Sequence, residues 1–419
     1  FISIDDNEAA NLKLLCDEVF GEENFVATNV WKKKQGGGND SKYFVIEHEY
    51  ILCYTKNIRS FSMELDTEHE LDDNLYPHKD EFGEYGLITL DKSSIQFSQS
   101  LVYEIKDREG NGYLPRVIKN KQSCWRWSKE KVERDYNQLV FKNGNVYTKY
   151  YRPEGVKPKS LLHEARFGRT ETGKEEITKL LGSGEFSYPK PLTLITHFIR
   201  IATKYSKNDI ILDFFAGSGT TAQAVMELNA EDGGNRRFIC VQLPEATEEK
   251  SEAYKAGYKT IADITRARIQ KVIDKIAKER DSKMDFDKQA LPQCNNYTLA
   301  PSNFKSWRGD VEGKEAIAQL LLDFTESQKQ GSQTDNMLVE LCLKSGLGLN
   351  VGYQKENGFY KTTLGVWFCF ETYTDAMKND IVAAKPQKLV CLNSCFTSDE
   401  VLSNLQLELK ENGIICLII

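Results

Sequence analysis

Ile211-Leu212-Asp213-Phe214-Phe215-Ala216-Gly217-Ser218-Gly219-Thr220-Thr221-Ala222 is the stretch of sequence that decides the fold class. An apolar run ends in an acidic residue, and a Gly-x-Gly turn then opens a pattern that is typical of a helix. Glycines let the backbone approach a ligand closely, and the amino end of a helix attracts an anionic group. The stretch therefore predicts a strand-to-helix turn that binds a small ligand.

Three ligand classes use turns of this kind. A phosphate-binding loop requires Gly-Lys-Ser/Thr, and no lysine follows the glycines here. A dinucleotide fingerprint requires a third glycine where this chain has Ala222. S-adenosylmethionine, a nucleoside with a carboxylate and no phosphate, fits what remains, and Asp213 is the candidate to hold its amino group or a water that does. The alternative is a tight turn that binds nothing.

The flanking sequence predicts one strand–helix–strand unit of a parallel sheet. Strands are expected at 209–215 and 237–242, with helices at 192–205 and from the glycine turn to Leu228. Gln242 ends the second strand and Glu245 follows shortly after it. Either side chain is a candidate to accept hydrogen bonds from ribose hydroxyls.

The remaining sequence differs in texture from one region to the next. Residues 60–184 are polar and rich in Tyr, Trp, Lys and Arg, with an expected hairpin at 140–147 around Asn143-Gly144. We expect an α/β core in two parts, an inserted domain, a polar linker at 281–288 and a smaller α/β domain. Their bounds are 1–59 and 185–280 for the core, 60–184 for the insertion and 292–419 for the last domain.

Composition argues against a disordered chain, a membrane-spanning protein and a metal-binding protein. The 419 residues carry a net charge of −7, with 40% hydrophobic and 28% charged residues, an ordinary globular balance for two or three domains. No apolar run approaches the roughly 20 residues that span a bilayer. The ten cysteines contain no Cys-x-x-Cys pair and the five histidines show no ligand spacing, so we expect no metal site and a reducing, cytoplasmic compartment.

One segment is strongly basic although the whole chain is acidic. Between Asn111 and Thr170 there are 14 Lys and Arg against 5 Asp and Glu, interleaved with aromatic residues. Cations hold phosphates and aromatic rings stack on bases, so this segment predicts a surface for a polyanion such as a nucleic acid; the alternative is a solvated basic surface over an aromatic core. The candidates to bind it are Arg116, Trp125, Arg126, Trp127, Lys129 and Arg152, together with Lys32, Lys33 and Lys34 before the glycine run 36–38, which is equally well a plain exposed loop.

The glycine turn resembles a known motif. Asp213 to Thr221 is similar to the cofactor motif of the β-class amino-methyltransferases, and Phe186-Ser187-Tyr188-Pro189-Lys190-Pro191-Leu192 resembles the Lys-Pro motif of that class. The resemblance implies that the cofactor-binding residues are Asp213, Phe215, Gly217, Ser218, Gly219, Thr220, Lys190 and Pro191. A lysine just before a helix start is placed to pair with the cofactor carboxylate, and proline suits a first helical position.

Essentially the whole chain resembles the modification subunits of type III restriction systems. The segments that carry this resemblance are 1–8, 48–57, 238–245, 257–264, 302–307 and 343–347. It implies a DNA adenine-N6 methyltransferase with a Rossmann-like S-adenosylmethionine-dependent sheet and a target-recognition domain at 60–184. It also implies double-stranded DNA as substrate, a homodimer and a separate restriction subunit as partner.

The chain departs from this family in one respect. No Pro-Pro dipeptide occurs, so the family's Asp-Pro-Pro-Tyr type motif, which accepts the hydrogens of the adenine amine, is absent. In the family this motif precedes the strand that resembles Phe1 to Ile4, and we expect a chain that begins downstream of it. We therefore assign no catalytic residue. The alternatives are a non-catalytic fragment or partner subunit that binds DNA or cofactor, and an RNA methyltransferase.

Overall fold

The structure is a computed structural model that describes residues 1–36, 42–182, 186, 188–203, 205–282, 290–305 and 327–419. The chain divides into two compact units, Phe1–Gln293 and Cys294–Ile419, and each is described by itself. The glycine run beyond Gly36, Ser187, most of the linker at 281–288 and the pair 306–307 lie outside the described residues.

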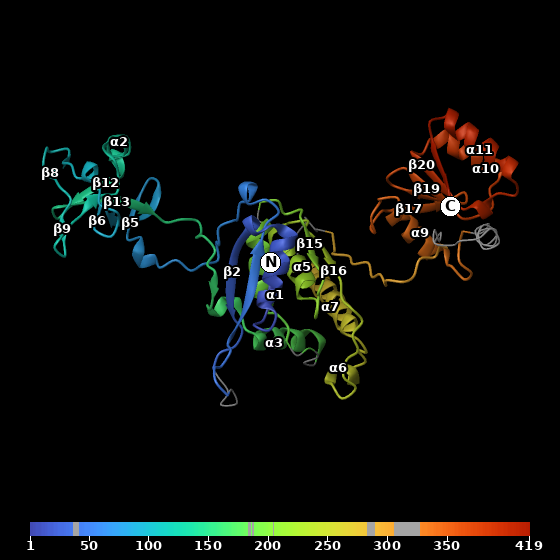
Figure 1. The fold of residues 1–419 in the computed structure, drawn as a ribbon, viewed down its shortest axis with the longest axis horizontal. Coiled ribbons are helices and arrows are strands. Elements are labelled where there is room, and N and C mark those ends of the chain that lie inside the picture. The colour runs from blue at the N-terminus through green and yellow to red at the C-terminus, as the bar shows by residue number, and fades with distance from the viewer. Residues whose placement is uncertain (37–41, 183–185, 187, 204, 283–289, 306–326) are drawn as a thin grey trace. The chain divides into compact units, whose positions relative to one another are not determined.

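The first unit contains a four-stranded sheet in the order β1-β3-β2-β14 (Figure 1). Its strands are β1 (Ile2–Ile4), β2 (Phe25–Lys32), β3 (His48–Tyr54) and β14 (Leu161–Leu162), and helix α1 (Ala9–Phe20) follows β1. β3 pairs antiparallel with both β1 and β2, whereas β14 pairs parallel with β2. α1 ends before Gly21, whose positive φ of +88° suits the residue that follows a helix.

The strand–helix–strand unit around the glycine turn is confirmed. β15 (Ile210–Asp213) and β16 (Arg237–Cys240) pair in parallel, with Asp213 opposite Cys240, and helix α5 (Thr220–Asp232) connects them. Helix α4 (Leu192–Thr203) packs on α5 through Ile199 and Val225. The carboxyl ends of the two strands therefore meet at one edge, where parallel sheets commonly bind ligands.

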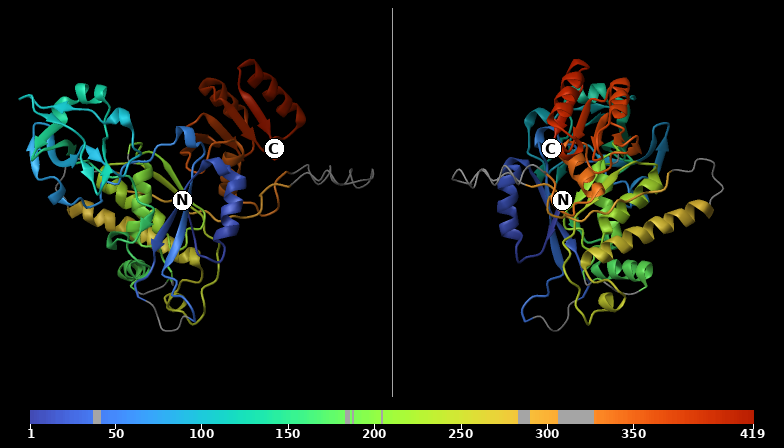
Figure 2. Two further views of the ribbon diagram at one scale, coloured as in Figure 1. Left: turned by 60° about the vertical axis from the view of Figure 1, so that its left-hand side comes forward. Right: turned by 90° about the vertical axis from the view of Figure 1, so that its right-hand side faces the viewer.

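Helices cover the α5 side of this unit. They are α3 (Thr170–Leu181) and the long helix α7 (Ile261–Ser282); the short helix α6 (Glu252–Lys255) precedes α7 in the chain. α7 contacts both α5 and α3, and the views of Figure 1 and Figure 2 agree on this neighbourhood. None of the helices in the described ranges is long and apolar enough to cross a membrane.

The segment 60–184 contains a small, mostly antiparallel β structure with its own core. Its elements are β4 (His78–Asp80), β5 (Gly83–Thr89), β6 (Asp91–Lys92), β7 (Ile105–Lys106), β8 (Gly112–Tyr113), β9 (Val117–Ile118), β10 (Lys121–Gln122), β11 (Cys124–Trp125), α2 (Lys129–Arg134), β12 (Leu139–Lys142) and β13 (Asn145–Tyr151). The expected Asn-Gly hairpin is confirmed between β12 and β13, because Asn143 and Gly144 both have positive φ, as a type I′ turn requires.

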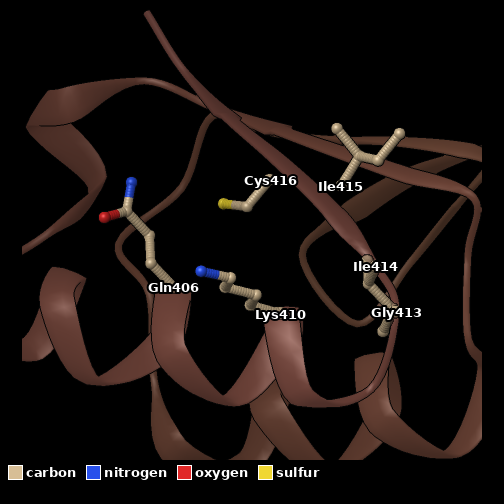
Figure 3. A pocket seen from close by; sticks show the side chains of 6 residues that line it. All are labelled: Gln406, Lys410, Gly413, Ile414, Ile415 and Cys416. Atoms are coloured by element: carbon tan, nitrogen blue, oxygen red, sulfur yellow. The ribbon is translucent and has the colours of Figure 1, made fainter.

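The second unit is a mixed α/β domain. Its elements are α9 (Thr334–Lys344), β17 (Tyr353–Glu356), β18 (Phe359–Thr362), β19 (Val366–Cys369), α10 (Asp375–Ala384), β20 (Lys388–Cys391), α11 (Asp399–Glu411) and β21 (Ile415–Ile418). The sheet order is β17-β18-β19-β20-β21, with β19, β20 and β21 parallel. A pocket of about 430 Å³ opens between α11 and β21 (Figure 3). Of its six lining residues only Lys410 carries a charge.

Short 3-10 helices complete the described structure. Their bounds are Glu22–Asn24, Ile58–Ser60, Asp73–Leu75, Gln99–Leu101, Tyr136–Gln138, Ala165–Phe167 and Asn393–Cys395.

Candidate functional site

The turn between β15 and α5 depends on its two glycines. Gly217 and Gly219 have φ angles of +52° and +82°, a backbone region that residues with a side chain rarely adopt. A Cβ atom on Gly219 would also lie 3.2 Å from the Cγ2 atom of Thr265, on α7 behind the turn. The Thr265 hydroxyl donates to the Gly217 carbonyl at 2.5 Å. The Gly-Ser-Gly sequence is therefore required by the shape of the turn.

Asp213 braces this turn from the end of β15. Its Oδ2 atom accepts a 2.5 Å hydrogen bond from the Thr221 hydroxyl, and its Oδ1 atom accepts one at 3.2 Å from the Phe215 amide. The side chain is half-buried, which leaves part of the carboxylate accessible from the edge of the sheet. Its expected contact with a ligand stays a prediction.

The two candidates for ribose contacts differ in their environment. The Oε1 atom of Gln242 accepts a 2.7 Å hydrogen bond from the Gly217 amide, so Gln242 helps to hold the turn. Glu245 is exposed just beyond the strand end. Phe215, the predicted aromatic contact, is 78% exposed beside Phe214. Glu245 is thus the more accessible acceptor of the two.

Lys190 lies next to the turn, as the pattern predicts, but in this structure it is ion-paired. Its Nζ atom is 2.6 Å from Oε2 of Glu49 on β3, and the Nζ atom of Lys33 is 3.1 Å from the other oxygen. Burial alone would raise the pKa of Glu49, but the two ammonium groups outweigh burial and hold it below its ordinary value. The Thr220 hydroxyl donates to the Lys190 carbonyl at 3.2 Å. Pro191 is buried directly before α4.

Three residues of this site were not predicted from the sequence: Glu49, Thr265 and Arg268. Glu49 reaches Lys190 across 141 positions of sequence, which no local pattern reveals. Arg268 does leave a signal, because it occupies the apolar stripe of α7 between the buried residues Ile264 and Val272. A charge at helical spacing among buried positions indicates a buried polar partner.

The basic segment places some of its predicted DNA contacts in its core. Trp125 is 2% exposed and donates its Nε1 hydrogen to the Tyr103 carbonyl, so it is a core residue and not a base-stacking one. Arg126 donates to the Thr89 carbonyl and the Thr148 hydroxyl, and burial lowers its pKa. Neither side chain is free to contact DNA in this structure.

The other predicted DNA contacts lie nearer the surface. The Arg116 guanidinium makes two bonds, at 2.8 and 2.9 Å, to the buried Asp91. Trp127 is half-buried, Lys129 is exposed, and Arg152 pairs with Asp73 at 2.6 Å. Outside this segment, Lys32 is 3.7 Å from Glu47, Lys34 is exposed, and Lys33 belongs to the Glu49 pair.

The described residues contain no group of three or more His, Cys, Asp or Glu that could hold a metal ion. The turn and the segments beside it offer carboxylate, ammonium and backbone groups. This combination suits a small ligand with a carboxylate, an amino group and hydroxyls.

Comparison with known proteins agrees with this geometry. Residues 1–255 match the sequence profile of a family described as DNA methylase. The chain is 37% identical over 375 residues to the type III restriction-modification enzyme EcoPI Mod subunit of Escherichia phage P1, a match that covers 83% of this chain and 56% of that protein. It is 32% identical over 399 residues to the StyLTI Mod subunit of Salmonella typhimurium, covering 89% of this chain and 56% of that protein.

A third relative is the type II methyltransferase M.KpnI of Klebsiella pneumoniae, 36% identical over 293 residues, with 65% of this chain and 69% of that protein covered. The chain spans about half the length of the type III relatives it matches. The family match covers more than half of the chain and includes the whole glycine turn. The chain therefore belongs to the DNA methylase family, and over most of its length it is similar to the modification subunits of type III restriction enzymes.

Proposed function

We propose that this chain binds S-adenosylmethionine at the Gly217–Thr220 turn and serves methyl transfer to adenine N6 in DNA, as a type III modification subunit. One observation carries the proposal: a parallel strand–helix–strand unit holds Asp213 and two glycines with positive φ at one edge, and the backbone of Lys190 is hydrogen-bonded to the same turn. The names of the relatives support the substrate and the system. The proposal includes a Rossmann-like cofactor-binding sheet, in which β15 and β16 are two neighbouring parallel strands.

The residues present fit this cofactor. Asp213 and Glu245 are carboxylates at the strand ends, suited to the cofactor's ammonium group and ribose hydroxyls. Gly217 and Gly219 let the ligand approach the backbone, and the amino end of α5 favours its carboxylate. The ammonium group of Lys190 can exchange the Glu49 carboxylate for the cofactor carboxylate, because both groups are anionic. When bound, the cofactor supplies an electrophilic methyl group on its sulfonium.

For the DNA side we propose the basic hairpin of β9 and β10. Lys119 and Lys121 are exposed on it, and Lys119 and Asn120 both have positive φ, which forms a tight two-residue tip. The Arg116–Asp91 pair anchors the base of the hairpin. Exposed cations on a rigid projection are suited to phosphate contacts. Double-stranded DNA is the proposed ligand, and stronger binding to RNA would contradict it.

The assembly is also proposed. The type III relatives are named as Mod subunits of restriction-modification enzymes, which supports a restriction subunit as partner of the whole protein. We also propose a homodimer, which the resemblance to that family implies. All ten cysteines are free thiols and seven of them are buried, which suits the reducing cytoplasm that we propose.

A second candidate function is cofactor and DNA binding without catalysis by this chain. The absence of any Pro-Pro dipeptide from the 419 residues favours it, since no Asp-Pro-Pro-Tyr type acceptor of the adenine amine is present. We assign no catalytic residue for the same reason.

Transfer of labelled methyl groups from S-adenosylmethionine to unmethylated bacterial DNA tests the proposal. The digested DNA is analysed for N6-methyladenine, with the Asp213→Ala variant as control. Label in that base, lost in the variant, supports the methyltransferase. Binding of both cofactor and DNA without transfer supports the second candidate, and label in another base or only in RNA refutes the adenine assignment.

A further inference from the structure

Helix α7 inserts one arginine behind the glycine turn. The Arg268 side chain is 0% exposed, and its Nη1 atom donates to the Ser218 hydroxyl at 3.0 Å and to the Thr220 hydroxyl at 2.8 Å. Its Nε atom donates to Oε1 of Gln223 at 2.7 Å. Ser218, Thr220 and Gln223, which lie within six residues of one another, therefore all accept hydrogen bonds from the Arg268 guanidinium.

The arginine fixes the direction of these hydroxyl groups. A guanidinium only donates, so the Ser218 and Thr220 oxygens accept from Arg268. The Thr220 hydroxyl then turns its own hydrogen to the Lys190 carbonyl, 3.2 Å away. A continuous line of hydrogen bonds therefore runs from α7 through the glycine turn to the backbone of Lys190, so it joins the two segments that carry the cofactor motifs.

A carboxylate on α3 completes the arrangement. Oε2 of Glu176 accepts a 2.9 Å hydrogen bond from the Leu192 amide, at the first turn of α4, and lies 3.9 Å from Nη2 of Arg268. Burial raises the pKa of Glu176, and burial lowers the pKa of Arg268 to about 10, which still leaves the guanidinium charged at neutral pH. Arg268 is thus held between the start of α4 and the start of α5.

A second polar tie between α7 and α5 serves as a comparison. The Nζ atom of Lys275 is 3.0 Å from Oε1 of Glu227, and Lys275 is nearly half exposed. This ion pair joins the same two helices as Arg268 does and is linked to Arg268 only through Gln223, whose Nε2 atom donates to Oε1 of Glu227 at 3.0 Å. Within the described residues it makes no hydrogen bond or ion pair with Ser218, Thr220 or Lys190. Loss of Lys275 therefore weakens the helix packing without releasing the turn.

We propose that Arg268 is a positioning residue for the cofactor: it aligns the Gly217–Thr220 turn with the Lys190 segment and so sets the affinity for S-adenosylmethionine without touching it. The proposal rests on the cofactor site proposed above. Arg268 lies outside residues 1–255, the part of the chain that matches the DNA methylase family. Its Nη2 atom makes no hydrogen bond within the described structure and lies 3.9 Å from Oε2 of Glu176.

The test compares Arg268→Lys with Lys275→Met in the full chain. Lysine keeps the charge near Glu176 but cannot reproduce the fork of donors that reaches two hydroxyls and Gln223. Hydrogen–deuterium exchange without cofactor reports the Gly217 and Gly219 amides, which are hydrogen-bonded to Gln242 and Ala216. Calorimetry with S-adenosylmethionine then reports affinity, and the melting temperature of each variant reports stability.

For Arg268→Lys we expect exchange at these amides to accelerate about tenfold and affinity to fall about 10- to 100-fold, the loss of one to two charge-assisted hydrogen bonds. For Lys275→Met we expect a lower melting temperature with both readouts at wild-type values. Should Arg268→Lys bind the cofactor as the wild type does, the positioning role is overturned while the cofactor site stands. Should the wild type itself not bind, the cofactor site and the positioning role are both overturned, even if exchange at the turn accelerates.

Discussion

Replacement of Glu49 by glutamine is expected to destabilise the first unit and to do so in a pH-dependent way. The Glu49 carboxylate is 17% exposed and sits between two ammonium groups, Lys190 at 2.6 Å and Lys33 at 3.1 Å. Glutamine keeps the shape of the side chain but removes its charge. Both lysines then lose their anionic partner in a half-buried environment.

The magnitude follows from this geometry. Breaking a fully buried pair costs about 3–5 kcal/mol, and an exposed pair contributes about 0–1 kcal/mol. The two lysine side chains are about a quarter exposed, at 26% and 27%, so water partly compensates for the lost partner. We therefore expect Glu49→Gln to lower the free energy of unfolding by about 2 kcal/mol at neutral pH.

The sign of the pH dependence follows from the lowered pKa of Glu49. A carboxyl group whose pKa is lower in the folded state stabilises the fold above its unfolded pKa, and this contribution is lost as pH falls through the folded pKa. The ordinary value is 4.5, and the neighbouring ammonium groups, working against burial, hold the pKa of Glu49 below it. The difference between wild type and Glu49→Gln is thus largest at neutral pH and shrinks below about pH 4.5.

Urea unfolding at several pH values measures this effect, with Glu47→Gln as the matched control. Glu47 is two residues away and 3.7 Å from Lys32, and both side chains are about a third exposed, so we expect less than about 1 kcal/mol from its loss. Equal effects of the two substitutions at neutral pH, or a Glu49→Gln effect that does not shrink on acidification, would refute the reasoning.

Three further predictions concern other parts of the first unit. Burial lowers the pKa of His197 to about 4, so the free energy of unfolding is expected to fall between about pH 6.5 and 4 as the unfolded chain takes up a proton. Urea unfolding of His197→Gln is expected to show a flatter dependence on pH, and an unchanged dependence contradicts the prediction. Lys119→Ala with Lys121→Ala is expected to weaken DNA binding and reduce the salt slope by about 1–2, measured by anisotropy against the exposed Lys271→Ala as control. Trp125→Ala is expected to cost about 3–5 kcal/mol and to reduce DNA binding only together with loss of fold in circular dichroism; a folded variant with lost DNA binding would point to a direct contact.

Features that depend on local backbone geometry were predictable from the sequence. The glycine turn and the Asn143-Gly144 hairpin require positive φ at fixed positions, and few residue types provide it. The strand and helix around the turn follow from periodicity over short windows. The positions of β15, α5 and β16 were therefore correct to within a few residues.

Features that depend on distant pairing were not predictable. Aromatic and basic residues form both cores and DNA surfaces, and only the pairing of β11 with β6 decides that Trp125 is internal. In α1 the apolar residues Leu15, Cys16 and Val19 follow helical spacing, yet only Cys16 is buried and the other two are exposed. Likewise, Lys190 has a carboxylate partner, Glu49, on a strand 141 residues earlier, so its charge is already paired within the protein.

Calorimetric titration of S-adenosylmethionine into wild type, Asp213→Ala and Asp209→Ala tests the central claim most directly. Asp209 directly precedes β15 and Asp213 ends it, so the two variants change the two flanks of one strand and only Asp213→Ala changes the turn. We predict saturable binding by the wild type and by Asp209→Ala, and none by Asp213→Ala. Equal affinity of Asp213→Ala and wild type, or no binding by the wild type, would contradict the assignment of the cofactor site.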